Sequence, residues 1–372
     1  LPFTTIDANR GIAYAKTECV CQKLGVNDNP KNSICKKGFR FIPINLLDVA
    51  GLVPGAHKGK GLGNRFLNDL SRADVLLHII DITGSMDKSG NRIKEGENDP
   101  YEDIIFLEEE INLWFKEILE REDWNKFIKA YAREKSKFID ELENRLSGLK
   151  ISKYQIIQAI KKTKLELKKP SQWTDKDRYN FSKTLRELSK PIIIIANKID
   201  KPIGKSKLKE LKAKYKKKIV PCSSLAEYYL RDFEEKGIIE YIPGSNDFKI
   251  IKKDELSAKE IDALKNIKER ILIPFGETGV QKALNYATFE LLNQICVYPV
   301  YDINKFTDKN ENVLPDVFLI TQGTKLKNFI RKAIHSDLAD HFIYGIDAIS
   351  KKRLGEDYIL KHNDIIKVVS AK

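Results

Sequence analysis

The sequence has no long apolar run, no secretory signal pattern and few cysteines. None of its 372 residues belongs to an apolar run approaching the roughly 20 residues that a membrane-spanning helix needs. No charged segment followed by a short apolar stretch opens the chain, as a secretory signal would. Five cysteines in a chain of this length do not form a disulfide framework. These absences argue against a membrane or secreted protein and predict a cytoplasmic one.

Acidic residues are outnumbered by basic ones. Lys and Arg together number 66 and Asp and Glu 53, which gives a formal net charge of +13. A basic surface attracts polyanions, most often nucleic acid. A proteome rich in lysine gives the same excess, so charge alone is only weak support for an RNA partner.

Four short apolar runs indicate strands of a parallel sheet. The runs are continuous rather than alternating, as in strands that are buried on both faces. Ligands of open α/β sheets bind at the carboxyl ends of strands. We therefore expect Asp48, Asn197 and the region of Ser223, which follow three of these runs, to converge on one site. The runs are residues 41–47, 75–80, 191–196 and 219–221.

Residues 101–189 have a different pattern. Apolar side chains recur at helical spacing between residues 104 and 146. Ser152 is a candidate helix N-cap, and Thr174 with Asp177 resembles a capping box. We predict a helical insertion between two strands of the sheet.

Residues 297–372 combine strands with one helix. Apolar runs at 297–300 and 317–320 predict two strands, and Thr324 is expected to cap a helix that follows them. Further runs at 342–346, 358–360 and 365–369 predict more strands. Two strands, a helix and then more strands is the order of a ubiquitin-like β-grasp.

The tetrad Asn197-Lys198-Ile199-Asp200 has the N-K-x-D pattern of guanine recognition. The Asp carboxylate can accept hydrogen bonds from guanine N1–H and from its exocyclic amine. Adenine has a lone pair at N1 and no amine at C2, so it would leave a buried carboxylate unpaired. The aliphatic stem of Lys198 can lie along the base. A plain turn after a strand is the alternative for so short a motif.

A second motif, Asp48-Val49-Ala50-Gly51, matches D-x-x-G. In GTPases its Asp holds Mg²⁺ through water and its Gly N–H contacts the γ-phosphate. The next residues carry repeated glycines, which give a backbone that a nucleotide switch can reshape. These glycines are Gly55, Gly59, Gly61 and Gly63. An ordinary flexible loop does not explain their placement directly after D-x-x-G.

These motifs identify the chain as resembling Obg-family GTPases, and in particular the YchF-like branch of archaeal and eukaryotic type. Residues 48–64 resemble switch II, residues 1–11 switch I and residues 222–227 the last guanine-contact loop. Segments 316–319 and 355–358 resemble a TGS domain. The resemblance spans nearly the whole chain.

The resemblance implies an α/β fold of defined organisation. A P-loop NTPase-type G domain with an inserted helical domain is followed by a C-terminal β-grasp (TGS) domain. We expect the first part of the G domain at residues 1–100, the helical insertion at 101–189, the second part at 190–296 and the TGS domain at 297–372.

The same resemblance implies a nucleotide site with Mg²⁺ as cofactor and GTP as substrate. Thr5 and Asp48 would hold Mg²⁺, and backbone N–H groups near Ser224, where the family usually has Ala, would meet guanine O6. The implied nucleotide-binding residues are Phe3, Thr4, Thr5, Asp48, Val49, Ala50, Gly51, Asn197, Lys198, Asp200, Ser223, Ser224 and Leu225.

The chain departs from the family pattern in two places. It contains no G-x-x-x-x-G-K-[ST] phosphate loop, which the family places just upstream of switch I. We expect this to reflect truncation before residue 1 rather than evolutionary loss. In addition, Leu52 follows Gly51 where Ras-type GTPases carry the Gln that orients water. Hydrolysis should then be slow, or should depend on K⁺, backbone groups or a partner, so switch II supplies no certain catalytic residue.

Cys19, Cys21 and Cys35 are weak candidates for a zinc site. Structural zinc takes four ligands, usually with C-x₂₋₄-C spacing. This chain has C-x-C and no nearby fourth Cys or His. Free thiols are therefore the favoured interpretation, and metal binding is the alternative.

We predict a monomeric GTP-binding protein that hydrolyses GTP slowly and acts as a nucleotide-dependent switch at the ribosome or on RNA, with no membrane partner. One alternative is a nucleotide-independent RNA or ribosome adapter that keeps the G domain as a scaffold. Another is an ATPase, which Asp200 disfavours. The RNA prediction draws on a basic set in the C-terminal module. Its members are Lys325, Lys327, Arg331, Lys332, Lys351, Lys352 and Arg353.

Overall fold

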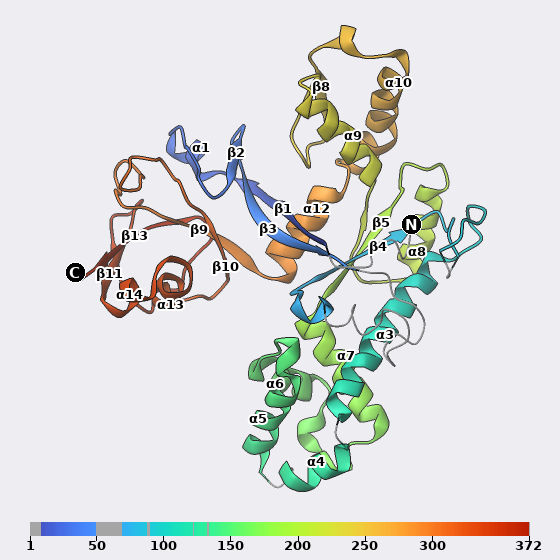
Figure 1. Ribbon diagram of the computed structural model, residues 1–372, viewed down its shortest axis with the longest axis vertical. Helices are drawn as coiled ribbons and strands as arrows, with labels where there is room; N and C mark the ends of the chain where they lie inside the picture. The colour runs from blue at the N-terminus through green and yellow to red at the C-terminus, as the bar shows by residue number, and fades with distance from the viewer. Residues whose placement is uncertain (1–8, 50–68, 88–89, 122, 132–133, 372) are drawn as a thin grey trace. The chain divides into compact units, whose positions relative to one another are not determined.

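The computed structural model describes residues 9–49, 69–87, 90–121, 123–131 and 134–371. Contacts divide the chain into two units (Figure 1). Unit 1 comprises residues 1–11 and 47–283, and unit 2 comprises residues 12–46 and 284–372. Among the described residues, no helix has the length and hydropathy needed to cross a membrane. The four-part domain division remains a prediction.

Unit 1 contains a parallel sheet in the order β4-β5-β6. The strands are β4 (Leu76–Asp81), β5 (Ile192–Asn197) and β6 (Ile219–Pro221). Residues 193–196 of the central strand are all buried, as expected for a strand covered on both faces. The register pairs Asp81 with Asn197, so the carboxyl ends of β4 and β5 lie side by side. Three of the four predicted strands are confirmed here.

The remaining apolar run, residues 41–47, forms β3 (Phe39–Asp48). The prediction that it belongs to the parallel sheet is wrong. Among the described residues, β3 lies between β1 (Asn9–Glu18) and β2 (Ile34–Lys36), and it is antiparallel to β2. Only its first part is buried, and most of its second half is exposed. A continuous apolar run indicates a strand, but it does not specify the direction of the neighbouring strand.

The predicted helices between β4 and β5 are present. They are α3 (Pro100–Glu120), α4 (Trp124–Tyr131), α5 (Lys135–Leu146), α6 (Lys153–Lys162) and α7 (Asp175–Ser189). Ser152 caps α6 in a capping box with Gln155, and Thr174 caps α7 in a capping box with Asp177. Both predicted caps are confirmed.

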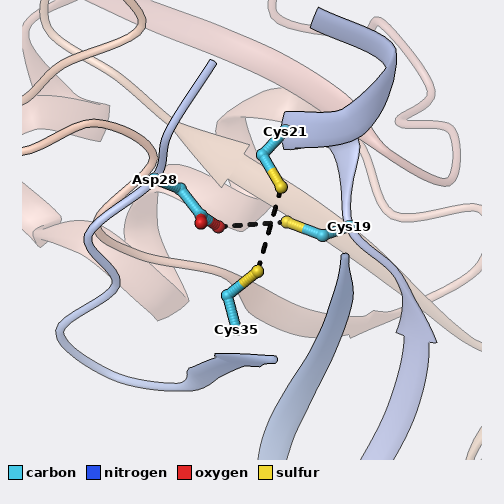
Figure 2. Close-up of side chains that lie close together, drawn as sticks. All are labelled: Cys19, Cys21, Asp28 and Cys35. Atoms are coloured by element: carbon cyan, nitrogen blue, oxygen red, sulfur yellow. Dashed lines mark hydrogen bonds between the residues drawn. The ribbon is translucent and has the colours of Figure 1, made fainter. Parts of the chain in front are cut away.

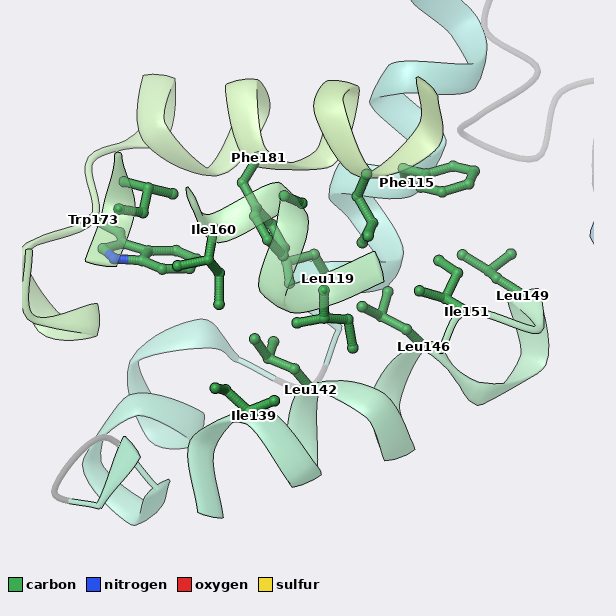
Figure 3. Close-up of a cluster of buried hydrophobic side chains, with 14 of the residues drawn as sticks. Phe115, Leu119, Ile139, Leu142, Leu146, Leu149, Ile151, Ile160, Trp173 and Phe181 are labelled. Carbon is green, nitrogen blue, oxygen red and sulfur yellow. The ribbon is translucent and has the colours of Figure 1, made fainter. Parts of the chain in front are cut away.

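The apolar faces of these helices share one core (Figure 3). Phe115 and Leu119 of α3, Leu142 of α5 and Phe181 of α7 are each at most 1% exposed. Trp173, just before α7, lies against Phe181 at a ring separation of 5.3 Å. Burial of these large side chains is the main favourable term that holds the helices together.

After β5, unit 1 continues mainly with helices and one small hairpin. The helices are α8 (Gly204–Lys214), α9 (Ser224–Glu235), α10 (Ala258–Ile267), α11 (Ile273–Phe275) and α12 (Val280–Asn285). A π-helical turn at Lys268–Leu272 joins α10 to α11. The hairpin pairs β7 (Ile239–Tyr241) with β8 (Phe248–Ile250).

Unit 2 contains a mixed five-stranded sheet in the order β10-β9-β13-β11-β12. Its strands are β9 (Gln294–Pro299), β10 (Phe318–Thr321), β11 (Phe342–Asp347), β12 (Arg353–Leu354) and β13 (Asp364–Ser370). β9 and β13 are parallel and the other pairs are antiparallel. The helices α13 (Leu326–Phe329) and α14 (Ser336–Asp340) follow β10. This is the predicted β-grasp arrangement.

Two local predictions for this domain are wrong. Residues 358–360 form no strand, because Ile359 makes only an isolated bridge to Lys325. The helix begins one step later than expected, with Lys325 as its N-cap, while the Thr324 hydroxyl donates to the Thr321 carbonyl at 2.6 Å.

The remainder of unit 2 packs against this C-terminal domain. β2 and the short helix α1 (Val20–Leu24) share a buried cluster with Tyr298 and Leu314. Arg40 is fully buried and donates to the Leu314 carbonyl at 3.0 Å. Asn32 exchanges two hydrogen bonds with the Val317 backbone, at 2.9 and 3.0 Å. Residues 19–42 are therefore integrated into the C-terminal fold.

Candidate functional site

The N-K-x-D tetrad and the loop after β6 are tied together at the carboxyl edge of the parallel sheet. The Asn197 Oδ1 accepts from the Ser224 backbone N–H at 3.0 Å and from the Ser224 hydroxyl at 3.1 Å. The Ser223 hydroxyl donates to Asp200 Oδ1 at 2.7 Å. The structure thus brings these four predicted site residues together. Ser224 stands where the family usually has alanine, and its hydroxyl makes a contact with Asn197 that alanine could not make.

Backbone hydrogen bonds continue the strand pairing into this loop. The Cys222 N–H donates to the Ala196 carbonyl at 2.8 Å, and the Ile199 N–H donates to the Cys222 carbonyl at 3.1 Å. Lys198 lies between them at φ 64°, a left-handed conformation that is uncommon outside glycine and often marks functional sites. The tetrad is therefore held by its backbone as well as by its side chains.

Lys198 also contacts a residue that the sequence did not assign to the site. Its Nζ lies 2.9 Å from Asp81 Oδ2, at the end of β4. Burial raises the pKa of Asp81, but hydrogen bonds from Ser85, Thr83 and Lys198 outweigh burial and hold this pKa below its usual value. Asp81 thus fixes the lysine stem over the edge of the sheet. In the sequence, the only indication that Asp81 belongs to the site is that it directly follows the apolar run 75–80.

A buried carboxylate supports the loop after β6 from behind. Glu227 of α9 is only 4% exposed, and its Oε2 accepts from Thr278 at 2.5 Å and from Tyr241 at 2.8 Å. Burial and this carboxylate raise the pKa of Tyr241 above its usual value, which keeps the phenol a donor. The Thr278 carbonyl in turn accepts from the Ser223 N–H at 2.9 Å.

Gly279 lies against the same loop. Its φ is +91°, and a Cβ at this position would lie 2.0 Å from the Pro221 carbonyl oxygen. Only glycine permits this approach. No local pattern connects residues 278 and 279 to a loop more than 50 positions earlier, so sequence reasoning missed them.

A small cavity opens beside Asp200. Its volume is about 180 Å³, and Asp200, Ser223 and Leu225 line it together with Tyr229 of α9 and Arg270. Leu225 is 58% exposed at this edge. The cavity provides an apolar wall next to a carboxylate, a combination that suits a planar polar ring.

Most of the expected phosphate and Mg²⁺ residues lie outside the described residues. These are Phe3, Thr4, Thr5, Ala50, Gly51 and Leu52. β3 ends at Asp48, which is exposed, as a water-mediated Mg²⁺ partner would have to be. Val49 is half-buried and packs against the helical core, so its side chain anchors the segment. The convergence of Asp48 with Asn197 remains a prediction.

The basic set of the C-terminal domain is partly neutralised. Lys325 pairs with Asp357 at 2.6 Å, and Lys327 pairs with Glu356 at 2.5 Å. Arg331 pairs with Asp340 at 2.8 Å. Three of the seven predicted cations thus have acidic neighbours, which weakens the charge argument for RNA binding.

Family models match three parts of the chain. One described as "Obg-like GTPase YGR210-like, G4 motif-containing domain" matches residues 195–302. One described as "50S ribosome-binding GTPase" matches residues 1–110, and a TGS domain model matches residues 330–370.

Individual relatives match over most of the chain. A GTP-binding protein of Methanocaldococcus jannaschii is 45% identical over 100% of this chain and 92% of its own length. A GTP-binding protein of Schizosaccharomyces pombe is 36% identical over 87% of this chain and 80% of its own. The ribosome-binding ATPase YchF of Bacillus subtilis is 25% identical over 98% and 90%. A crystal structure of a GTP-binding protein from Pyrococcus horikoshii matches with a TM-score of 0.77 and 36% identity, over 98% of this chain and 93% of that one.

Proposed function

Since the chain belongs to the Obg-like, YchF-type family of GTP-binding proteins, we propose that it binds GTP with Mg²⁺, hydrolyses it slowly and acts as a nucleotide-dependent switch. The observation that carries this proposal is the pair of contacts that join Asn197 to Ser224 and Asp200 to Ser223. These contacts hold the Asn197 amide and the Asp200 carboxylate at the end of the parallel sheet, which supports recognition of one base by a donor and an acceptor.

The hydrogen-bonding pattern of these two side chains matches guanine. Ser224 occupies Asn197 Oδ1, so the group that Asn197 can offer a base is its Nδ2 donor. Guanine presents N7 and O6 as acceptors. Ser223 uses Asp200 Oδ1, so Asp200 Oδ2 can accept from guanine N1–H and its amine. Adenine would leave that carboxylate without a donor, which is how a buried polar group rejects the wrong ligand.

The phosphate side of the site is proposed from sequence. Thr5 and Asp48 would hold Mg²⁺, which neutralises charge on the phosphates. Leu52 has no group that can orient water, so unaided hydrolysis should be slow, and a K⁺ ion, backbone groups or a partner would have to assist it.

Substituting Asp200 tests the base assignment. Asp200→Asn replaces an acceptor with an amide that can donate, so it should weaken competition by GTP and strengthen competition by xanthosine triphosphate, whose C2 carbonyl accepts. Displacement of a fluorescent guanine nucleotide by GTP, ATP and the xanthosine analogue measures both effects. Asp254→Asn removes the same charge from an exposed position and is the matched control. An unchanged preference for GTP in Asp200→Asn would refute the assignment.

A specific observation supports ATP as a second candidate nucleotide. Obg-like ATPase 1 of Homo sapiens is 28% identical over 65% of this chain, and the YchF relative is also named an ATPase. If this chain shared that preference, ATP would displace the fluorescent nucleotide at least as well as GTP. Asp200 and its Ser223 contact favour GTP.

We also propose a ribosome or RNA partner for a monomeric, cytoplasmic protein. Support comes from the net charge of +13, from the match to the family described as "50S ribosome-binding GTPase" and from the relative named ribosome-binding ATPase YchF. Co-sedimentation with ribosomes in each nucleotide state, over a range of salt concentrations, tests this, because contacts to phosphates weaken as salt rises. Absence of co-sedimentation in every state would contradict it. Ribosome binding of equal strength in every nucleotide state would favour the alternative of a nucleotide-independent adapter.

A further inference from the structure

Four side chains of unit 2 point toward one another at a place that the nucleotide site does not involve (Figure 2). They are Cys19, Cys21, Asp28 and Cys35, and their sulfur and carboxylate oxygen atoms all lie within 4.8 Å of one another. Cys19 and Cys21 are buried, and the Asp28 side chain is only 8% exposed. Apolar packing gives no reason to gather three thiols around a carboxylate.

The local backbone explains how a C-x-C spacing can converge. Cys19 is the N-cap of α1 and has an extended conformation, whereas Cys21 lies in the first helical turn. Residues two apart in a regular helix point in nearly opposite directions, so this change of backbone conformation is what lets the two sulfurs approach one point. Asp28 comes from the loop after α1, and Cys35 comes from β2. The fourth candidate ligand is the Asp28 carboxylate, which spacing patterns of Cys and His alone do not include.

The separations fit the edges of a metal tetrahedron. The Cys21 and Cys35 sulfurs are 3.8 Å apart, and the Cys19 sulfur lies 3.1 Å from Asp28 Oδ2. Tetrahedral zinc with Zn–S bonds of about 2.3 Å and Zn–O bonds of about 2.0 Å requires sulfurs about 3.8 Å apart and a sulfur–oxygen separation of about 3.5 Å. The two sulfurs already have this spacing, and Cys19 and Asp28, now at hydrogen-bond distance, would separate by a few tenths of an ångström on binding the ion. A disulfide needs about 2.05 Å between sulfurs. The cluster is therefore arranged for a shared ion more closely than for a disulfide.

We propose that Cys19, Cys21, Asp28 and Cys35 bind a single structural zinc ion. Three thiolates and a carboxylate suit zinc, since soft sulfur ligands select it over magnesium or calcium. All four positions are filled by the protein, which is the mark of a structural rather than a catalytic zinc site. The ion belongs to unit 2 and is distinct from the Mg²⁺ expected beside GTP.

Arg40 completes the electrostatics of this site. Its Nη2 lies 2.9 Å from Asp28 Oδ2, and its side chain is fully buried. Three thiolates and a carboxylate carry more negative charge than a divalent ion neutralises, and a buried guanidinium offsets part of the excess. The same contact fixes the orientation of the carboxylate, as outer-shell partners of metal ligands do.

The zinc ion would hold a segment that has little secondary structure of its own. α1 has five residues and β2 has three, too few to be stable in isolation. Cys19 and Cys21 share a buried cluster with Cys296, Tyr298 and Leu314 of the C-terminal domain. A zinc ion that joins α1, the following loop and β2 would fix this segment in the shape that packs against that domain.

Metal analysis of the protein purified without chelator and under reducing conditions tests the proposal. We expect about one zinc ion per chain, and loss of most of it in Cys21→Ala/Cys35→Ala. Cys296→Ala is the matched control, because it removes a buried thiol of the same unit that is not one of the four proposed zinc ligands. It should keep its zinc. Zinc removal should lower the Tm of the wild type and have little effect on the double variant.

Cobalt substitution gives a readout that does not depend on a variant folding. Co²⁺ added to the zinc-depleted wild type should give the intense visible bands of a tetrahedral thiolate complex, and zinc should abolish them. Protein that carries no zinc, gives no cobalt bands and has all its thiols open to alkylation after mild denaturation would overturn the proposal. A Cys21–Cys35 disulfide in protein purified under reducing conditions would overturn it as well.

Discussion

Substitution of Gly279 by alanine should weaken guanine binding through the loop after β6. The new Cβ would lie 2.0 Å from the Pro221 carbonyl oxygen and 2.9 Å from the Cys222 Cα, whereas real Cβ contacts essentially never fall below 3.0 Å. Since the obstacle is backbone, the loop that carries Ser223 must retreat by about 1 Å. A hydrogen bond of ordinary length does not survive such a shift.

The magnitude follows from the contacts that depend on this loop. Each hydrogen bond lost near the base costs about 0.5–1.5 kcal/mol, and bonds to a charged group cost about twice as much. Loss of one or two corresponds to roughly a 10- to 100-fold rise in the Kd for guanine nucleotide, because about 1.4 kcal/mol is tenfold. A positive φ also costs an alanine roughly 1–2 kcal/mol of folding stability.

Gly276→Ala separates these two effects. Gly276 has a φ of +78°, but nothing lies within 4 Å of the position its Cβ would take. Both variants should lose stability in thermal unfolding because of the positive φ, and Gly279→Ala should lose more because its Cβ also meets the backbone. Only Gly279→Ala should show the rise in Kd, measured by titration with a fluorescent guanine nucleotide. Equal affinities in the two variants would refute the conclusion that Gly279 positions the loop.

Two further substitutions probe the surroundings of the base site. Glu227→Gln should cost about 1–3 kcal/mol of unfolding free energy in denaturant titrations. Thr278 and Tyr241 donate to one oxygen of this buried carboxylate and Arg231 donates to the other, and an amide has only one oxygen to accept. Glu235→Gln, at the exposed end of the same helix, should cost little. For Asp81, whose pKa lies below its usual value, the stabilising contribution is complete above the unfolded pKa of about 4 and is lost as pH falls through the lower folded value. Asp81→Asn should therefore flatten the acid limb of the stability profile, and an unchanged limb would contradict the stabilisation of the Asp81 carboxylate by its hydrogen bonds from Ser85, Thr83 and Lys198.

The sequence predicted those parts of the fold that leave local patterns. The apolar runs became β3, β4, β5 and β6, and the capping boxes at Ser152 and Thr174 are present. The proposed base site could also be predicted from the sequence, because the carboxyl ends of parallel strands lie along one edge of a sheet. That rule alone placed Asn197 and the Ser223 loop together.

Contacts between distant positions left no such pattern. The support from Thr278 and Gly279 depends on a chain reversal that brings residues about 55 positions apart into contact. The cysteine cluster leaves a weak signal in the sequence because its fourth member, Asp28, is neither Cys nor His, and because the convergence of the C-x-C pair depends on where helix α1 begins. Sequence spacing describes ligands along one regular element, and this cluster draws on three successive segments.

Competition for the base site tests the central claim most directly. The protein would be titrated with a fluorescent guanine nucleotide and Mg²⁺, and the complex would then be challenged with GTP and ATP. Displacement by GTP at concentrations at which ATP has no effect is the result predicted by the Asn197 and Asp200 contacts. Equal or better displacement by ATP would contradict guanine recognition, whatever the rate of hydrolysis.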